Sequence, residues 1–154
     1  MLLSFPDAQS FATGAARYFY RPIAGYDKSP RIIAPVEIER ITTYAVVDTG
    51  APYVICAPDV AQVLGLKLAA ALSKQRMLVR GVVMNGRLYR LTLRLLADRG
   101  ESLSVDATAF ILDPEFEESW GKLPSFIGLS GCLERLRFAV DPATDTFYFG
   151  PLEE

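Results

Sequence analysis

Short runs of β-branched and apolar residues, separated by turn residues, follow one another from position 32 to position 150. In the segment 88–95 apolar and polar residues partly alternate, as a strand with one buried face requires. Met84-Asn85-Gly86 separates two such runs, and Asn-Gly at this place is a strong signal for a tight hairpin turn. The pattern predicts strands at residues 32–39, 41–47, 53–56, 76–83, 87–95, 103–112, 137–140 and 146–150, with a short apolar run at 126–128.

Helical signals are few. Residues 57–66 predict one short helix, because Pro58 suits the first helical turn and Gly65 can close the last. The segment 113–124 carries four acidic residues and is predicted as a loop. A second short helix is predicted from three leucines spaced at i, i+4 and i+7, which would share one face: Leu129, Leu133 and Leu136.

The first 30 residues differ from the rest, since they are rich in aromatic, glycine and proline residues and show no sustained period. We expect an N-terminal extension over residues 1–30, ordered by packing its aromatic side chains onto the body. Passive packing is the favoured role, with a subunit contact or a cleft-blocking pro-segment as alternatives. A length of 154 residues corresponds to roughly one domain of about 150. Residues 31–150 are therefore predicted as one domain, followed by a tail at 151–154.

Composition excludes several classes of function. The chain has no histidine, which removes Ser-His-Asp triads, Cys-His dyads and nearly all catalytic zinc sites. Its two cysteines, Cys56 and Cys132, are interpreted as buried thiols, and we expect neither a metal nor a cofactor. Sixteen basic against 18 acidic residues give a net charge of −2 without charge blocks, so nucleic acid is not an expected partner. No apolar run approaches 18 residues, and a soluble, cytoplasmic protein without membrane contact is expected.

One carboxylate stands at a place suited to chemistry. Asp48-Thr49-Gly50-Ala51 comes directly after the apolar strand that ends at Val47, so the strand end presents an acid. The glycine allows the backbone to come close to a partner. Taken alone, Asp-Thr-Gly occurs by chance in roughly 3% of chains of this length, and an ordinary strand-ending turn is the alternative.

The order of the surrounding segments strengthens this signal. The apolar strand, the acid, a short strand and helix, a hairpin and a late Phe126-Ile127-Gly128-Leu129 run follow one another over residues 32–150. In this order and in these motifs the sequence resembles the retropepsin-like aspartic proteases, the single-lobed, retroviral type. The resemblance implies an all-β, acid-protease-like fold: a mostly antiparallel closed β barrel with two short helices.

The resemblance also implies an activity. Members of this family are homodimeric endopeptidases, in which a water is activated by one aspartate from each subunit and attacks a bound peptide. By this carry-over Asp48 is the catalytic acid of each chain, Thr49 joins the two active-site loops by hydrogen bonds across the two-fold axis, and Gly50 lets the backbone approach the substrate. The expected partners are a second copy of the chain and an extended peptide or protein.

The hairpin from Arg80 to Arg87 corresponds to the family's flap, which closes over the substrate. Gly81 and Gly86 would give it mobility. A plain surface hairpin is the alternative for this segment, and Phe126 is interpreted as a core residue. The residues predicted to bind substrate are Ala51, Gly81, Val82, Val83, Met84 and Ile127.

Two other functions remain open. The same dimer could bind peptides or proteins with weak or no cleavage. A non-catalytic β-barrel interaction module, in which Asp48-Thr49-Gly50 is only a turn, is the third interpretation. The sequence departs from the family pattern at Leu129 and Ser130, where members often carry a charged residue that ties the dimer.

Overall fold

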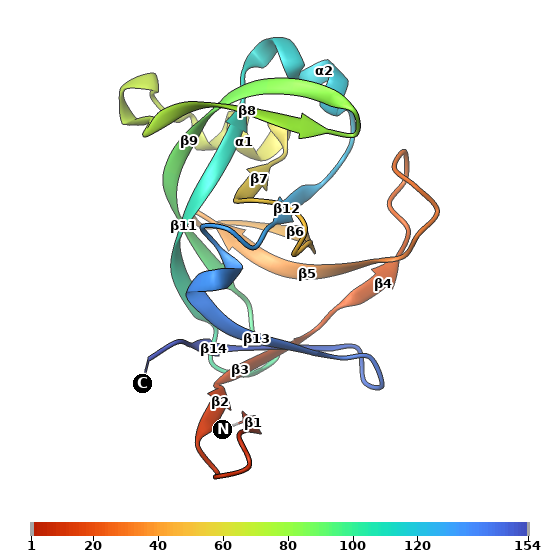
Figure 1. Ribbon diagram of the computed structural model, residues 1–154, viewed down its shortest axis with the longest axis vertical. Helices are drawn as coiled ribbons and strands as arrows, with labels where there is room; N and C mark the ends of the chain where they lie inside the picture. Colours follow the sequence, from red (N-terminus) through yellow and green to blue (C-terminus); the bar gives the residue numbers. More distant parts are fainter. Residues whose placement is uncertain (1, 154) are drawn as a thin grey trace.

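The computed structural model describes residues 2–153 and consists mainly of β-strands (Figure 1). Its helices are α1 (Pro58–Leu64) and α2 (Glu117–Trp120), with three 3₁₀ turns, η1 (Leu68–Ala70), η2 (Pro114–Phe116) and η3 (Leu133–Arg135). Its strands are β1 (Leu3–Ser4), β2 (Ser10–Ala12), β3 (Gly14–Arg17), β4 (Phe19–Arg21), β5 (Arg31–Ile38), β6 (Ile41–Val47), β7 (Val54–Cys56), β8 (Ser73–Val79), β9 (Val82–Leu95), β10 (Arg99–Gly100), β11 (Leu103–Leu112), β12 (Ser125–Ile127), β13 (Leu136–Asp141) and β14 (Thr146–Pro151).

An eight-stranded sheet forms the body, in the order β4-β5-β6-β12-β7-β11-β9-β8. The long strand β9 also pairs with β5, so the sheet curls round and joins to itself there. Most pairs are antiparallel, and the parallel pairs are β7 with β11 and β6 with β12. The predicted all-β architecture is thus confirmed, with closure limited to the β5–β9 pairing, because β4 and β8 remain edge strands.

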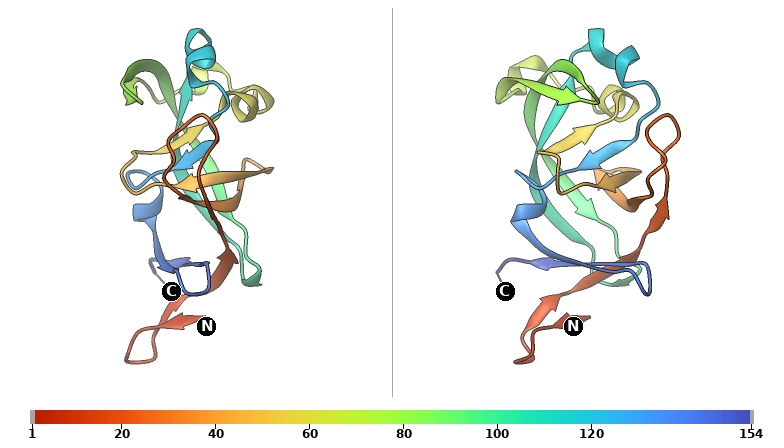
Figure 2. Two further views of the ribbon diagram at one scale, coloured as in Figure 1. Left: turned by 90° about the vertical axis from the view of Figure 1, so that its right-hand side faces the viewer. Right: turned by 45° about the vertical axis from the view of Figure 1, so that its right-hand side comes forward.

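A second sheet ties the N-terminal residues into the fold, in the order β10-β3-β14-β13 (Figure 2). The sequence predicted no strands before position 31, yet β3 pairs with β14 along four residue pairs and β4 pairs with β5. Residues 14–17, Gly-Ala-Ala-Arg, have little intrinsic preference for strands. Their small side chains fit against the aromatic residues of β14, so tertiary packing decides their conformation.

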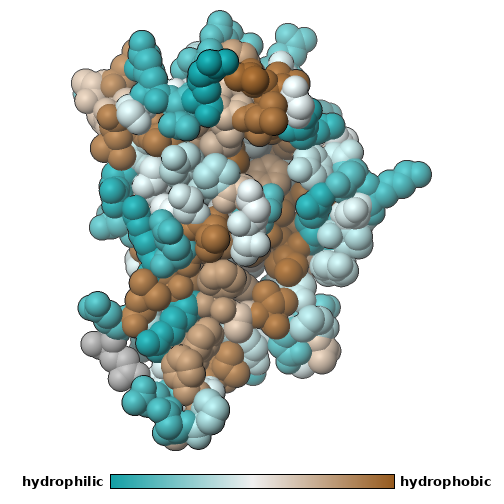
Figure 3. Space-filling model, viewed as in Figure 1, coloured by the Kyte–Doolittle hydropathy of each residue, from teal (hydrophilic) through white to brown (hydrophobic). Residues whose placement is uncertain are grey.

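Two clusters of buried side chains hold the sheets together. The first lies between the body and the second sheet and includes Leu93, Leu133 and Phe149. The second lies under the β8–β9 hairpin and includes Phe110 and Trp120, whose indole N–H donates to the Leu123 carbonyl at 2.8 Å. Apolar side chains also reach the surface, as a brown band down the middle of the face in Figure 3.

The predicted hairpin turn is wrong. The hairpin formed by β8 and β9 turns at Arg80 and Gly81, whose φ angles of 53° and 80° suit a two-residue type I′ turn. Asn85 and Gly86 lie inside β9 instead. A Cβ atom on Gly86 would collide with the carbonyl of Ile111, so this glycine serves the close approach of β11 and not a turn.

The helices are partly confirmed. Helix α1 begins and ends where the sequence predicted, and Gly65 follows it in the left-handed conformation. The predicted helix through the three leucines is wrong, because only the short 3₁₀ turn η3 forms and Leu136 already begins β13. The second helix, α2, lies within the acidic segment predicted as a loop.

Candidate active site

Asp48 follows β6 directly and begins a tight turn. Its backbone N–H donates to the Ile127 carbonyl at 3.0 Å, and its carbonyl accepts from the Ala51 N–H at 3.1 Å. Its Oδ1 atom accepts a hydrogen bond from the Gly50 N–H at 3.0 Å. The side chain is half-buried while Thr49 and Gly50 are exposed. The turn therefore holds one carboxylate oxygen in place at the edge of the body.

A second loop, after β12, braces this turn. Strand β12 lies between β6 and β7, so its end reaches both sides of the turn. The Gly128 N–H donates to the Tyr53 carbonyl at 2.7 Å, and the Leu129 N–H donates to the Ala51 carbonyl at 2.8 Å. The Cβ position of Gly128 is occupied by these same two carbonyls, so a glycine is required there. The two sequence motifs that carried the resemblance are thus one structural unit.

A pocket of about 170 Å³ lies beside Asp48 and beneath the β8–β9 hairpin. Asp48 is the one carboxylate among the described residues that line it. The lining mixes apolar and aromatic side chains with polar groups, and consists of Tyr26, Asp48, Gly50, Ala51, Pro52, Ile55, Met77, Leu78, Val79, Arg80, Trp120 and Phe126. The structure therefore brings the predicted acid together with the hairpin, from parts of the chain about 30 residues apart.

The predicted substrate-binding residues divide into three groups. Ala51 lines the pocket. Gly81, Val82 and Val83 belong to the hairpin tip without lining the pocket, and the two valines are 44% and 47% exposed. Met84 does not line the pocket, and its side chain is only 2% exposed and packs in the second cluster.

Ile127 does not line the pocket either. Its side chain is fully buried in the first cluster, and its backbone carbonyl holds the Asp48 N–H instead. The neighbouring Phe126 is buried, as predicted, yet it also lines the pocket. Successive side chains of a strand point to opposite faces, so only one of the pair can face the pocket.

Several lining residues were not predicted. Met77 and Val79 line the pocket because the turn at Arg80 and Gly81 sets the register of β8. The sequence placed this turn at residues 84–86, so the register of β8 was not predicted. Trp120 comes from α2, which was predicted as loop. Tyr26 comes from the N-terminal extension, and no local pattern pointed to it.

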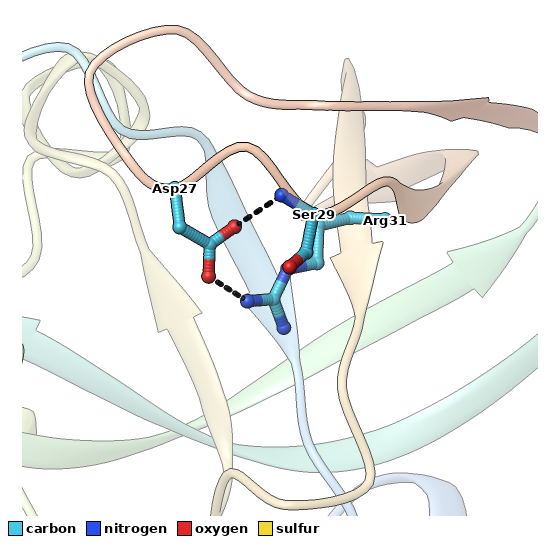
Figure 4. Close-up of polar contacts among 3 residues, drawn as sticks. All are labelled: Asp27, Ser29 and Arg31. Atoms are coloured by element: carbon cyan, nitrogen blue, oxygen red, sulfur yellow. Dashed lines mark hydrogen bonds and ion pairs between the residues drawn. The ribbon is translucent and has the colours of Figure 1, made fainter.

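The loop that carries Tyr26 is held by a small polar network (Figure 4). Asp27 accepts hydrogen bonds from the Ser29 N–H at 3.0 Å and from the Arg31 guanidinium at 2.5 Å. The hydrogen bond to Asp27 raises the pKa of Arg31. Burial lowers this pKa in part, and the charge of Asp48 raises it by a smaller amount. Arg31 is therefore held by an ion pair with Asp27.

Other reactive groups are placed away from this pocket. Cys56 and Cys132 are free, buried thiols, as predicted, and burial raises the pKa of each to about 12. Among residues 2–153, no three side chains of the His, Cys, Asp or Glu type are grouped so as to hold a metal ion. In the same part of the chain, no helix is long and apolar enough to span a membrane.

Solved structures share this architecture. A crystal structure of a retropepsin-like aspartic protease from Rickettsia conorii matches with a TM-score of 0.54 and 20% sequence identity, covering 94% of this chain and 99% of that chain. The chain has a retropepsin-like fold. Since 94% of the chain is covered, the shared retropepsin-like fold takes in most of the N-terminal extension.

A crystal structure of the retroviral protease-like domain of Ddi1 from Leishmania major also matches. Its TM-score is 0.46 at 18% sequence identity, and the match covers 80% of this chain and 97% of that chain. No protein-family model and no curated protein matches the sequence.

Proposed function

We propose that this protein is a homodimeric aspartic endopeptidase. The observation that carries the proposal is the position of Asp48, half-buried on a braced turn and lining a pocket beneath a β-hairpin. A retropepsin-like fold supports it. The substrate class is an extended peptide or protein segment, because such a chain can offer side chains to the pocket and main-chain groups to the hairpin.

The reaction needs two carboxylates in different protonation states. One ionised Asp48 accepts a proton from a water, whose oxygen attacks the peptide carbonyl carbon, while a second, protonated carboxyl donates to the carbonyl oxygen. A tetrahedral diol results. Its collapse breaks the C–N bond as a proton passes to the leaving amine, and a carboxylic acid and an amine are released.

Each chain supplies one such carboxylate to the described pocket, so the second must come from another copy. Two-fold association would place the Asp48 side chains of two subunits together near the axis. Like charges at short distance share a proton, which provides one acid and one base at the same pH. We assign Thr49 to hydrogen bonds between the two turns, and Gly50 to close contact with the substrate backbone.

The β8–β9 hairpin is proposed as the flap, with its tip at Arg80 and Gly81. Val82 and Val83 are exposed at this tip and would gain a surface to cover when a peptide is bound. Closure would exclude water from the pocket and add main-chain hydrogen bonds to the peptide.

A digest of a peptide library at acidic and neutral pH tests the proposal. The parent protein is expected to cleave internal peptide bonds, and Asp48→Asn is expected to lose cleavage while keeping its fold, because the amide cannot exchange the proton. Asp59→Asn is the matched control, since Asp59 is an exposed carboxylate on α1 outside the pocket. Binding of peptides without any cleavage would favour the peptide-binding alternative, and equal cleavage by Asp48→Asn would refute the role of Asp48.

A further inference from the structure

The N-terminal extension contributes a side chain to the pocket that holds Asp48. Tyr26 lies in the loop 22–30 between β4 and β5, at the right of Figure 1. Most of this loop is exposed, and only Ile23 and Tyr26 pack against the second cluster. The loop therefore touches the body mainly through the two side chains that it directs toward the pocket region.

Two guanidinium groups and an aromatic ring fix the position of Tyr26. Its ring has Arg31 at 5.0 Å and Arg80 at 5.3 Å from its centroid, distances at which a cation is attracted to the ring face. The centroid of Phe126 lies 6.2 Å away on the pocket side. Arg31 is itself held by Asp27, so the loop, strand β5 and the hairpin tip meet at this one ring.

The location of the ring matters for what the pocket can accept. Arg80 belongs to the hairpin turn, so Tyr26 is the point where the extension touches the proposed flap. Phe126 stacks edge-on against Trp120 at 5.8 Å, and together with Tyr26 these rings form a continuous aromatic wall. The volume of about 170 Å³ is close to that of cavities that accept a single benzene ring. The pocket is partly open to solvent, so the side chains that form its walls, Tyr26 among them, govern which side chains it holds.

We propose that Tyr26 is a specificity-determining residue of this pocket, an inference that rests on the proposed function. As a wall of the pocket it favours side chains of up to one six-membered ring, such as leucine, methionine or phenylalanine, over tryptophan. Removing the ring widens the pocket on this side and admits tryptophan. The extension thus acts as a wall of the cleft, and packs against the flap tip at the same time.

The test compares peptides that differ only in one residue beside the cleaved bond, phenylalanine or tryptophan. The ratio of kcat/KM for the two peptides is measured for the parent, Tyr26→Ala, Tyr26→Phe and the control Tyr20→Ala. Tyr20 is a 60% exposed tyrosine of the same extension, on β4 and outside the pocket. The parent is expected to prefer phenylalanine, and Tyr26→Ala to lose about tenfold or more of that preference, since hydrophobic pockets discriminate by about 10–200-fold per group.

Tyr26→Phe and Tyr20→Ala are expected to keep the parent ratio, because the first retains the ring and the second leaves the pocket intact. If Tyr26→Ala fails to fold, Tyr26→Leu, which keeps apolar packing without the ring, takes its place. An unchanged ratio in the ring-deleted variant, with active parent protein, overturns the inference and leaves the proposed function standing.

A parent protein that cleaves neither peptide would refute the endopeptidase, and binding then decides the role of Tyr26. The same two peptides, fluorescently labelled, are titrated into Asp48→Asn with and without Tyr26→Ala. A loss of preference for phenylalanine in the double variant supports the inference independently of catalysis. If the ratio of the two peptide affinities is the same in Asp48→Asn and in the double variant, or if neither protein binds either peptide, the inference is overturned.

Discussion

Replacing Gly128 with alanine is expected to destabilise the fold through the turn that carries Asp48. The new Cβ would lie against the Ala51 carbonyl and 2.6 Å from the Tyr53 carbonyl, and both are backbone atoms that cannot rotate away. Gly128 is not in the left-handed region, so the effect is steric and not a matter of backbone strain. Relief requires β12 and the Asp48 turn to move apart.

The magnitude follows from this steric overlap and from the hydrogen bonds beside it. Overpacking at a rigid site costs about 1–3 kcal/mol, and weakening the hydrogen bonds from Gly128 and Leu129 adds about 1 kcal/mol. We expect the free energy of unfolding to fall by about 3 kcal/mol, a substantial part of the 5–15 kcal/mol typical of a domain. Displacing Asp48 by about 1 Å would also lower peptide turnover by roughly 100-fold.

Urea unfolding followed by circular dichroism measures the loss of stability. Gly50→Ala is the matched control for this measurement, since its Cβ would meet only the Asp48 Oδ1 atom, at 3.2 Å, and its backbone conformation suits alanine. We expect the control to change stability by less than about 1 kcal/mol. A loss below about 0.5 kcal/mol in Gly128→Ala would refute the close packing of the two loops.

Further predictions concern reactivity, pH and the hairpin. At neutral pH, Cys56 and Cys132 should react slowly with thiol reagents in the folded protein and rapidly in urea, because burial raises the pKa of each to about 12; fast labelling of the native state would contradict this. Burial and Asp145 raise the pKa of Tyr18, so the stability it contributes is present below its unfolded pKa and is lost as pH rises through the folded value. Urea unfolding should therefore show that the free energy of unfolding falls between about pH 9 and pH 11, and that it falls less in Tyr18→Phe than in the parent. An equal fall in both proteins would contradict this. Gly81→Val should lower peptide turnover strongly and the melting temperature only slightly, because valine is strained at a φ of 80° and this exposed tip belongs to the proposed flap. Comparable effects on turnover and on melting temperature would argue against a flap.

The sequence predicted those elements whose signals are local. Strands β6 and β11 have the predicted bounds, since their β-branched and apolar residues are bounded by turns. Helix α1 has its proline at the start and its glycine at the end. Asp48 directly follows β6, as the local order of the sequence predicted.

The remaining features depend on contacts between distant segments. Residues 14–17 become a strand through pairing with β14 and β10, which lie far away in the sequence. Asn85-Gly86 has the composition of a turn, yet β11 requires that glycine inside a strand. Met84 was predicted at the tip of a hairpin whose turn lies instead at Arg80 and Gly81. Ile127 faces the first cluster because it alternates with the pocket-lining Phe126 along β12. Tyr26 reaches the pocket through the fold of a loop that carries no periodic signal.

Mixing the parent protein with Asp48→Asn tests most directly whether one active site uses Asp48 from two subunits. Equal amounts of the two proteins are allowed to exchange subunits, and cleavage is compared with the same total concentration of parent. If both carboxylates are needed, only dimers of two parent chains are active, and about one quarter of the activity remains. Activity of about one half would mean that each chain acts alone, and it would contradict a paired Asp48 site.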